Sequence, residues 1–161
     1  MSSYNIKLVN LCVKNNFTIS LAESCTGGMI ASSLISVSGA SQVIDFSLVT
    51  YSNEAKNKFL DVPLKTLGRY GAVSKEVAKS MVTGLSKKTS ATICVSVTGI
   101  AGPGGGSKIK PVGLIYHGFY FKFDNKIVIK RNNFYGTRYQ IRKHATLYAE
   151  KFTYNYLKLS V

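Results

Sequence analysis

A short turn after an apolar segment carries three side chains that can do chemistry. Within Ala22–Gly28, a carboxylate, a hydroxyl and a thiol follow one another at Glu23, Ser24 and Cys25. The hydroxyl becomes a nucleophile when a base lies beside it, and an ionised thiol also attacks carbonyl carbons. We favour a buried structural cysteine over a second nucleophile. Glu23 either orients a donor group of the substrate or caps the next helix, and the sequence leaves both roles open.

A lysine is the best candidate for the base beside Ser24. The two histidines, His117 in an aromatic strand and His144 in the last helix, are expected in the core or on the surface, and the Gly-x-Ser-x-Gly motif is absent. Lys56 falls early in the helix predicted after Ser52, where burial and the helix dipole both disfavour a charged amine. A lysine at such a place is more often solvated, so position alone does not decide the role.

Further candidates lie where other predicted strands end. Tyr51 leaves the second strand and supplies either a phenol for a proton relay or a half-buried ring, while Thr98 ends a strand buried on both faces. The segment Gly99–Ser107 matches neither the dinucleotide fingerprint nor the P-loop, although its amides could bind an anion. Arg138 stands in the first turn of the last helix, where the dipole disfavours a cation and a bound phosphate would offset that cost.

The elements that must position these residues alternate along the chain. Hydrophobic periodicity predicts strands at 17–21, 43–51, 91–98, 114–123 and 126–131, and helices at 4–14, 27–37, after Ser52, at 74–88 and at 137–159, with a short helical piece between Pro63 and Gly68. Predicted helix caps are Ser2 or Ser3, Ser52, Ser74 and Thr137. This order predicts one domain over residues 1–161, an α/β fold built as a three-layer α/β/α sandwich around a mixed sheet.

Charge, hydrophobicity and cysteine content show which classes of protein the chain is unlikely to belong to. The 161 residues carry a net charge of +14, which suggests nucleic-acid binding, but the lysines and arginines are scattered, so we expect a basic surface and consider nucleic acid an unlikely partner. No stretch approaches the roughly 18 apolar residues of a membrane span, and the N-terminus lacks a signal-peptide pattern, so a cytoplasmic protein with no membrane partner is expected. Three cysteines without metal-ligand spacing argue against disulfides.

Four segments together carry a family resemblance: Ala22–Gly28, Val49–Lys56, Gly71–Ser74 and Thr98–Gly113. In this order, and over nearly the whole chain, they resemble the CinA C-terminal domain family, the nicotinamide-nucleotide amidohydrolases of the PncC type. Full-length CinA proteins also have an N-terminal molybdopterin-binding-like domain, so the sequence resembles the stand-alone form. Many members have a polar or charged residue where this chain has Gly104.

The resemblance implies an enzyme of the pyridine nucleotide cycle. It would hydrolyse the carboxamide of nicotinamide mononucleotide to nicotinate mononucleotide and ammonia, with no metal and no cofactor. Ser24 would be the nucleophile and Lys56 the general base, with Tyr51 close to both, and Arg138 would hold the phosphate. The expected substrate-binding residues are Glu23, Thr26, Gly27, Gly28, Ser41, Thr98, Gly99, Gly102 and Arg138.

These residues define a mechanism and leave two alternatives. Lys56 would take the proton of Ser24, and backbone amides near Gly27 and Gly28 or at Gly99 would stabilise the oxyanion. The alternatives are a nucleic-acid-binding accessory of competence or repair and a nucleotide-sensing module without catalysis. The presence of both Ser24 and Lys56 argues against the sensing module. We also expect a homodimer; the sequence does not decide between nucleotide salvage and removal of an inhibitory nucleotide.

Overall fold

The computed structural model describes residues 3–160 and is built on one five-stranded mixed sheet. The strand order is β2-β1-β3-β4-β5. The strands are β1 (Ile19–Glu23), β2 (Ile44–Val49), β3 (Ile93–Gly99), β4 (Leu114–Phe121) and β5 (Lys126–Asn133). β1 pairs in parallel with β2 and with β3, whereas β4 and β5 continue the sheet as antiparallel strands. The alternation of strands and helices early and the hairpin late explain this mixture.

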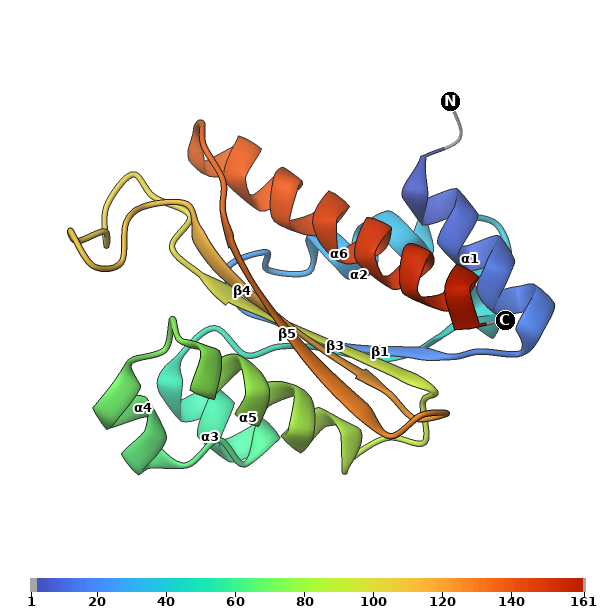
Figure 1. Ribbon diagram of the computed structural model, residues 1–161, viewed down its shortest axis with the longest axis horizontal. Coiled ribbons are helices and arrows are strands. Elements are labelled where there is room, and N and C mark those ends of the chain that lie inside the picture. The colour runs from blue at the N-terminus through green and yellow to red at the C-terminus, as the bar shows by residue number, and fades with distance from the viewer. Residues whose placement is uncertain (1–2, 161) are drawn as a thin grey trace.

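Helices cover both faces of the sheet, which confirms the three-layer α/β/α architecture. Figure 1 shows α1, α2 and α6 on one face and α3, α4 and α5 on the other. Their bounds are α1 (Tyr4–Asn15), α2 (Met29–Ile35), α3 (Asn53–Leu60), α4 (Leu64–Tyr70), α5 (Lys75–Ser86) and α6 (Arg138–Ser160), with a short 3-10 helix at Ala40–Gln42. No helix among the described residues is long and apolar enough to cross a membrane.

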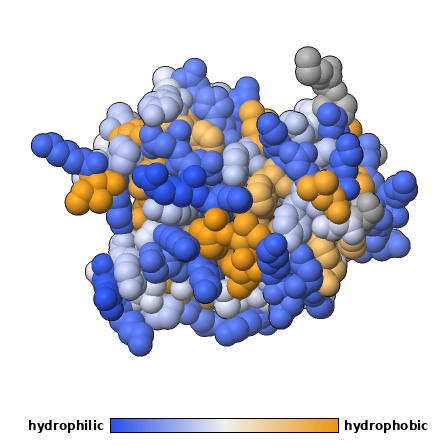
Figure 2. Space-filling model, in the orientation of Figure 1, coloured by the Kyte–Doolittle hydropathy of each residue, from blue (hydrophilic) through white to orange (hydrophobic). Residues whose placement is uncertain are grey.

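Two hydrophobic clusters hold the layers together. On the α6 face, Phe121 of β4 stacks on Tyr156 of α6 with ring centroids 3.8 Å apart. Phe119 packs against Phe152 with the rings tilted and the centroids 4.4 Å apart. The α5 face instead buries mainly aliphatic side chains, among them Leu60, Val82 and Leu85. In Figure 2, hydrophilic residues spread over most of the visible surface, and a compact hydrophobic patch lies where β5 crosses this face in Figure 1. The sheet is therefore a rigid platform between two packed layers.

Local signals placed most helix starts correctly. Ser52, Ser74 and Thr137 accept hydrogen bonds from the amides of Ala55, Val77 and Gln140, which confirms these three caps. Ser3 occupies the predicted N-cap position of α1, but its hydroxyl donates to the Asn5 side chain and accepts from no helix amide. Ser2 lies outside the described residues.

The boundaries of the first strand and second helix are both shifted from the prediction. The strand was expected at 17–21 and runs from Ile19 to Glu23, so the reactive turn follows it directly. The helix was expected from Gly27 and begins at Met29, because Gly28 has a φ of 92° and serves as its N-cap. Glycine adopts a positive φ readily, and a residue with a positive φ cannot be part of a right-handed helix, so α2 cannot extend back through Gly28.

Candidate active site

The carboxyl ends of the three parallel strands meet at one edge of the sheet. Glu23, the last residue of β1, pairs with Val49 of β2 and with Val97 of β3. The residues that follow these positions, including Ser24 and Thr98, therefore gather at the same edge. This is the place where open α/β sheets bind ligands.

A polar cavity of about 160 Å³ opens at this edge. Its lining comes from all three strand ends, from α3, from the α4–α5 connection and from the start of α6. The lining residues are Ser24, Cys25, Tyr51, Lys56, Ala72, Val73, Thr98, Gly99, Ala101 and Arg138. The structure thus brings together Ser24, Lys56, Tyr51, Thr98, Gly99 and Arg138, six residues that the sequence singled out.

Lys56 lies in the second turn of α3 and reaches back to Ser24. Its Nζ is 2.9 Å from Ser24 Oγ, and it donates to the carbonyl oxygens of Thr50 at 2.8 Å and Tyr51 at 3.1 Å. Only 1% of the residue is exposed. Among residues 3–160 the one ion pair joins Lys88 to Asp61, so no carboxylate compensates the Lys56 charge.

Burial lowers the pKa of Lys56 from 10.5 to about 8. Removal from water disfavours the ammonium form, so with this pKa roughly a tenth of the lysine is neutral at pH 7 and about half at pH 8. A neutral amine has two N–H groups and one lone pair. As an ammonium, Lys56 donates to Ser24 Oγ and to the carbonyls of Thr50 and Tyr51. As a neutral amine at the same position, it can keep its two N–H groups on the carbonyls and turn its lone pair to the Ser24 hydroxyl. This is the arrangement required of a general base.

Cys25 lies beside Ser24, but its thiol is held in the protonated, unreactive form. Burial raises the pKa of its thiol to about 12, so the thiol stays protonated near neutral pH. A protonated thiol is a poor nucleophile. These features support the prediction that Cys25 is structural.

Glu23 caps α2, which corrects its expected place among the substrate-binding residues. Its carboxylate accepts hydrogen bonds from the amides of Gly28, Ile30 and Ala31 at distances of 2.9, 3.2 and 2.9 Å. The residue is 0% exposed, and it does not line the cavity. Of the two roles left open, the structure has the helix cap, because the carboxylate satisfies amides that the first turn of a helix leaves unpaired.

The amides of Gly27 and Gly28 are also occupied, so they cannot bind an oxyanion as predicted. Gly27 N–H donates to the carbonyl of Ser24 at 3.1 Å, and Gly28 N–H donates to the Glu23 carboxylate. Thr26 is fully buried, and none of Thr26, Gly27 and Gly28 lines the cavity. These three residues shape the turn that presents Ser24, which replaces the predicted direct contact with substrate.

Arg138 and Tyr51 form one side of the cavity mouth. The Arg138 guanidinium donates to the carbonyl of Gly102 at 2.7 Å and to the phenol oxygen of Tyr51 at 3.0 Å. Tyr51 is 62% exposed, and its main-chain carbonyl, rather than its phenol, contacts Lys56. Gly102 does not line the cavity and instead anchors Arg138. The guanidinium keeps further N–H groups free for an anion.

Thr98 and Gly99 border the cavity at the end of β3. The Thr98 hydroxyl donates to the carbonyl of Ala72 at 2.8 Å, which ties the α4–α5 connection to the sheet. The Gly99 backbone packs close to β4, since an added Cβ would come within 2.2 Å of the Ile115 side chain. Both positions therefore fix the cavity wall.

Ser41 lies at the wrong end of the sheet for the predicted role. It belongs to the 3-10 helix that precedes β2, whereas the cavity follows the end of that strand. Six strand residues span roughly 20 Å. Ser41 instead borders a separate hollow with Ile35 and Gly39, so its assignment as a substrate-binding residue is corrected.

Four site residues had no predicted role of their own. Ala72, Val73 and Ala101 line the cavity, and their only signal was membership of the segments Gly71–Ser74 and Thr98–Gly113. Arg142 donates to the carbonyls of Cys25 and Thr26. Its position one helical turn after Arg138 was a usable signal, because residues four apart share a helix face.

One histidine lies in the core and the other on the surface, as predicted, and neither lines the cavity at Ser24. His117 is fully buried and its Nε2 lies 3.0 Å from the Ala145 carbonyl oxygen, and burial lowers its pKa to about 4. His144 borders a different hollow on α6. Among residues 3–160, no group of three or more His, Cys, Asp or Glu side chains could hold a metal ion.

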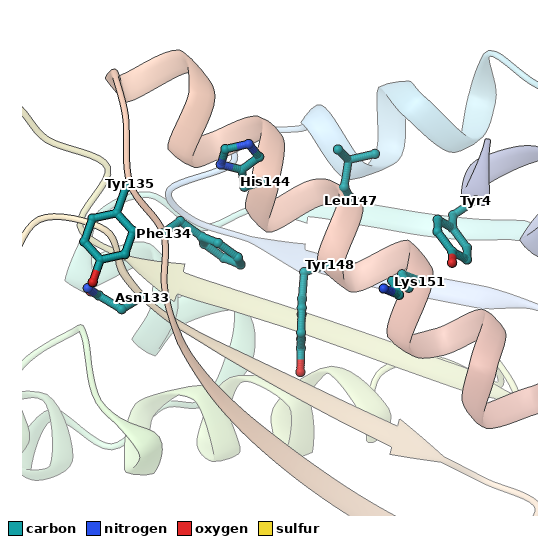
Figure 3. A pocket seen from close by; sticks show the side chains of 8 residues that line it. All are labelled: Tyr4, Asn133, Phe134, Tyr135, His144, Leu147, Tyr148 and Lys151. Atoms are coloured by element: carbon teal, nitrogen blue, oxygen red, sulfur yellow. The ribbon is translucent and has the colours of Figure 1, made fainter. Parts of the chain in front are cut away.

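The hollow on α6 is larger and mostly aromatic, and we call it the aromatic groove. It has a volume of about 580 Å³ and is lined by Tyr4, Asn133, Phe134, Tyr135, His144, Leu147, Tyr148 and Lys151. Figure 3 shows these side chains around α6, from Asn133, Phe134 and Tyr135 at the end of β5 to Tyr4 of α1, with Tyr148 directed toward the strands. It shares no lining residue with the cavity at Ser24.

Comparison with known proteins identifies the family. The family model of the CinA C-terminal domain matches residues 2–157 of the chain. The chain belongs to the CinA C-terminal domain family. It is 49% identical over 147 residues to a CinA-like protein of Petrotoga mobilis and 53% identical over 142 residues to one of Fusobacterium nucleatum. These matches cover 91% and 88% of the chain, and the chain spans only 36% and 33% of those CinA relatives.

Solved CinA structures share the fold over almost their full length. A CinA superfamily protein from Klebsiella pneumoniae superposes with a TM-score of 0.91 at 28% identity, with 96% of each chain covered. The competence/damage inducible protein CihA from Agrobacterium tumefaciens gives a TM-score of 0.86 at 36% identity, with 94% of each chain covered. The sandwich of helices around the mixed sheet is therefore the CinA fold.

Proposed function

We propose that this CinA domain hydrolyses the carboxamide of nicotinamide mononucleotide to nicotinate mononucleotide and ammonia. The observation that carries the proposal is the buried contact of 2.9 Å between Lys56 Nζ and Ser24 Oγ, combined with a lysine pKa lowered to about 8. A serine and a neutral lysine in contact are a nucleophile and its base. The amide substrate itself follows from the family resemblance.

In the first half of the reaction, Lys56 accepts the proton of Ser24 as Oγ attacks the carboxamide carbon. The tetrahedral intermediate carries a negative oxygen, which needs backbone donors. The Cys25 amide has no protein acceptor within residues 3–160 and its residue lines the cavity, so it replaces Gly27 and Gly28 as the candidate donor. Collapse of the intermediate breaks the C–N bond while Lys56 returns the proton to the departing nitrogen. Ammonia is released, and the acyl group remains on Ser24 as an ester.

In the second half, water replaces ammonia. Lys56 accepts a proton from water as the water oxygen attacks the ester carbon. Collapse of the second intermediate releases nicotinate mononucleotide, and Ser24 Oγ recovers a proton from Lys56. One lysine thus serves both steps, alternating between base and acid.

Arg138 is the proposed partner of the substrate phosphate. Its contacts with Gly102 and Tyr51 hold the guanidinium at the cavity mouth without neutralising it. A guanidinium matches the geometry of phosphate oxygens. The cavity of about 160 Å³ can hold the carboxamide end of the substrate, while the phosphate remains at the mouth.

The test is ammonia release from nicotinamide mononucleotide, with and without EDTA, by the purified chain and by Ser24→Ala. We expect turnover by the unmodified protein in both conditions and none by the variant. Binding of the mononucleotide without ammonia release would contradict the proposal and favour the sensing module. Activity that disappears with EDTA would contradict the metal-independent mechanism.

A further inference from the structure

Arg142 crosses from α6 to the turn that carries the nucleophile. Its Nε donates to the carbonyl oxygen of Cys25 at 3.0 Å, and its Nη2 donates to that of Thr26 at 2.7 Å. One planar guanidinium therefore holds two successive carbonyls directly after Ser24. A forked contact of this kind fixes direction as well as distance.

The turn is held from two sides by opposite charges. The Glu23 carboxylate accepts hydrogen bonds from amides at the start of α2, whereas the Arg142 guanidinium donates to the carbonyls of Cys25 and Thr26. Arg142 itself has no carboxylate within salt-bridge distance, since the one ion pair among residues 3–160 lies elsewhere. The backbone of the turn is therefore the polar partner of this cation.

Gly27 leaves the space that Arg142 needs. Its φ is 59°, and an added Cβ would lie 3.3 Å from Nη2 of Arg142. A side chain at this position would press on the guanidinium and would also strain the backbone. The glycine thus serves the arginine contact.

The contact fixes the direction of a neighbouring N–H group. A trans peptide is planar, so the Thr26 N–H points opposite to the Cys25 carbonyl that Arg142 holds. The Cys25 N–H likewise points opposite to the Ser24 carbonyl, which accepts from Gly27. Neither N–H group has a protein acceptor within residues 3–160. Cys25 lines the cavity whereas Thr26 is fully buried, so the Cys25 N–H is the one that can face a bound substrate.

We infer that Arg142 is a positioning residue that holds the turn after Ser24 and thereby fixes the Cys25 amide as an oxyanion donor for attack by Ser24. This rests on the proposed acyl transfer at Ser24. Arg138, one turn earlier on α6, lines the cavity and acts on the substrate directly, so the two arginines divide their roles. Loss of Arg142 weakens stabilisation of the intermediate and leaves substrate binding unchanged, so it lowers kcat and not KM.

The experiment compares Arg142→Met and Arg142→Lys with Arg131→Met, which removes an exposed arginine of β5. Two rates are measured for each protein: ammonia release from nicotinamide mononucleotide, and labelling of Ser24 by a fluorophosphonate, followed by intact mass. The second reaction forms an Oγ–P bond and releases fluoride, with the serine proton passing to Lys56. Its phosphoryl oxygen occupies the oxyanion position, so it needs no nucleotide.

We expect Arg142→Met to lower kcat and the labelling rate by about 10- to 100-fold with KM unchanged, as for other outer partners that orient a reacting group. Arg142→Lys should lose less, Arg131→Met nothing, and added guanidinium ion should partly restore Arg142→Met. Melting temperature and circular dichroism identify a misfolded variant, in which case Arg142→Lys provides the comparison.

Wild-type rates in a folded Arg142→Met would overturn the inference. If the unmodified protein labels at Ser24 but releases no ammonia, the proposed substrate is wrong, and the labelling rates still decide the role of Arg142. If the unmodified protein does neither, Ser24 is not activated, and both proposals are overturned.

Discussion

The cavity at Ser24 and the aromatic groove differ in what they can do with a bound molecule. The groove has a volume of about 580 Å³ and the cavity only about 160 Å³. The groove is lined mainly by aromatic side chains, which bind by burying area. The cavity holds an uncompensated lysine with a lowered pKa against a hydroxyl. Volume shows how much can bind, but an ionisable group kept in an unfavourable environment shows where a proton can move.

One helix contributes to both regions. The first turns of α6 supply Arg138 to the cavity and Arg142 to the nucleophile turn, while later turns supply Leu147 and Tyr148 to the groove. The two sets of side chains are separate, so substitutions can test each region alone. The comparison predicts that activity depends strongly on the small cavity and weakly on the large groove.

The largest effect is expected from Ser24→Ala, which removes the nucleophile. We expect kcat to fall by about 10⁴-fold or more, as for other enzymes that lose a nucleophilic serine. Cys25→Ala is the matched control, because its thiol is protonated, and it should stay within about 3-fold of the unmodified protein once folding is verified. The measurement is ammonia release. A Ser24→Ala protein that keeps its rate while Cys25→Ala loses it would reverse the assignment.

Lys56→Met should follow, with a loss of about 10²- to 10⁴-fold in kcat, the usual contribution of a general base. Its side chain fills similar space without a charge, so the variant should also be more stable than the unmodified protein at pH 7. Thermal melting and ammonia release measure the two effects. Lys58→Met, on the same helix and exposed, is the control. Reduced stability together with full activity would show that Lys56 serves packing alone.

The pH dependence should give a smaller, graded effect. Only neutral Lys56 accepts the serine proton, so kcat/KM should rise with pH and level off above the pKa of about 8. Below it the rate should fall by about 10-fold per pH unit. Because the folded-state pKa is lower than the usual 10.5, the unfolded chain binds more protons between about pH 8 and 10.5. Stability relative to Lys56→Met should therefore rise across that window. A flat rate profile would contradict this role.

The smallest effect on activity is expected from Leu147→Glu in the aromatic groove. The side chain is 40% exposed and shares no contact region with Ser24, so ammonia release should change by no more than about 3-fold. Leu64→Glu, an exposed leucine on α4, is the control. Loss of activity in folded Leu147→Glu alone would show that the two regions are coupled and would break the comparison.

Local chemistry explains what the sequence could predict. The caps at Ser52 and Ser74 act over three residues, so their side chains and amides are visible in the sequence itself. The alternation of strands and helices was enough for the three-layer fold. Because parallel strands share an edge, Ser24 and Thr98 could be expected together, and the structure has both in the cavity.

The errors come from interactions that local patterns do not determine. The Glu23 carboxylate accepts from an amide as far as eight residues along the chain. A local pattern does not show such a contact, so the sequence left the helix-cap role and the substrate role equally open. Gly27 and Gly28 looked free because glycine permits ligand approach, yet their amides are used within the turn. Ser41 was placed by motif without regard to strand direction, which puts it before β2 rather than after it.

The Arg142 contact spans 117 positions of the chain, and this has a consequence for biosynthesis. Chains emerge from the ribosome N-terminus first, at roughly 5–20 residues per second. Ser24, Lys56 and all five strands are therefore made before the helix that carries Arg138 and Arg142. A nascent chain that ends at β5 has its nucleophile and base but lacks both arginines, so full reactivity at Ser24 is expected only after the last helix docks.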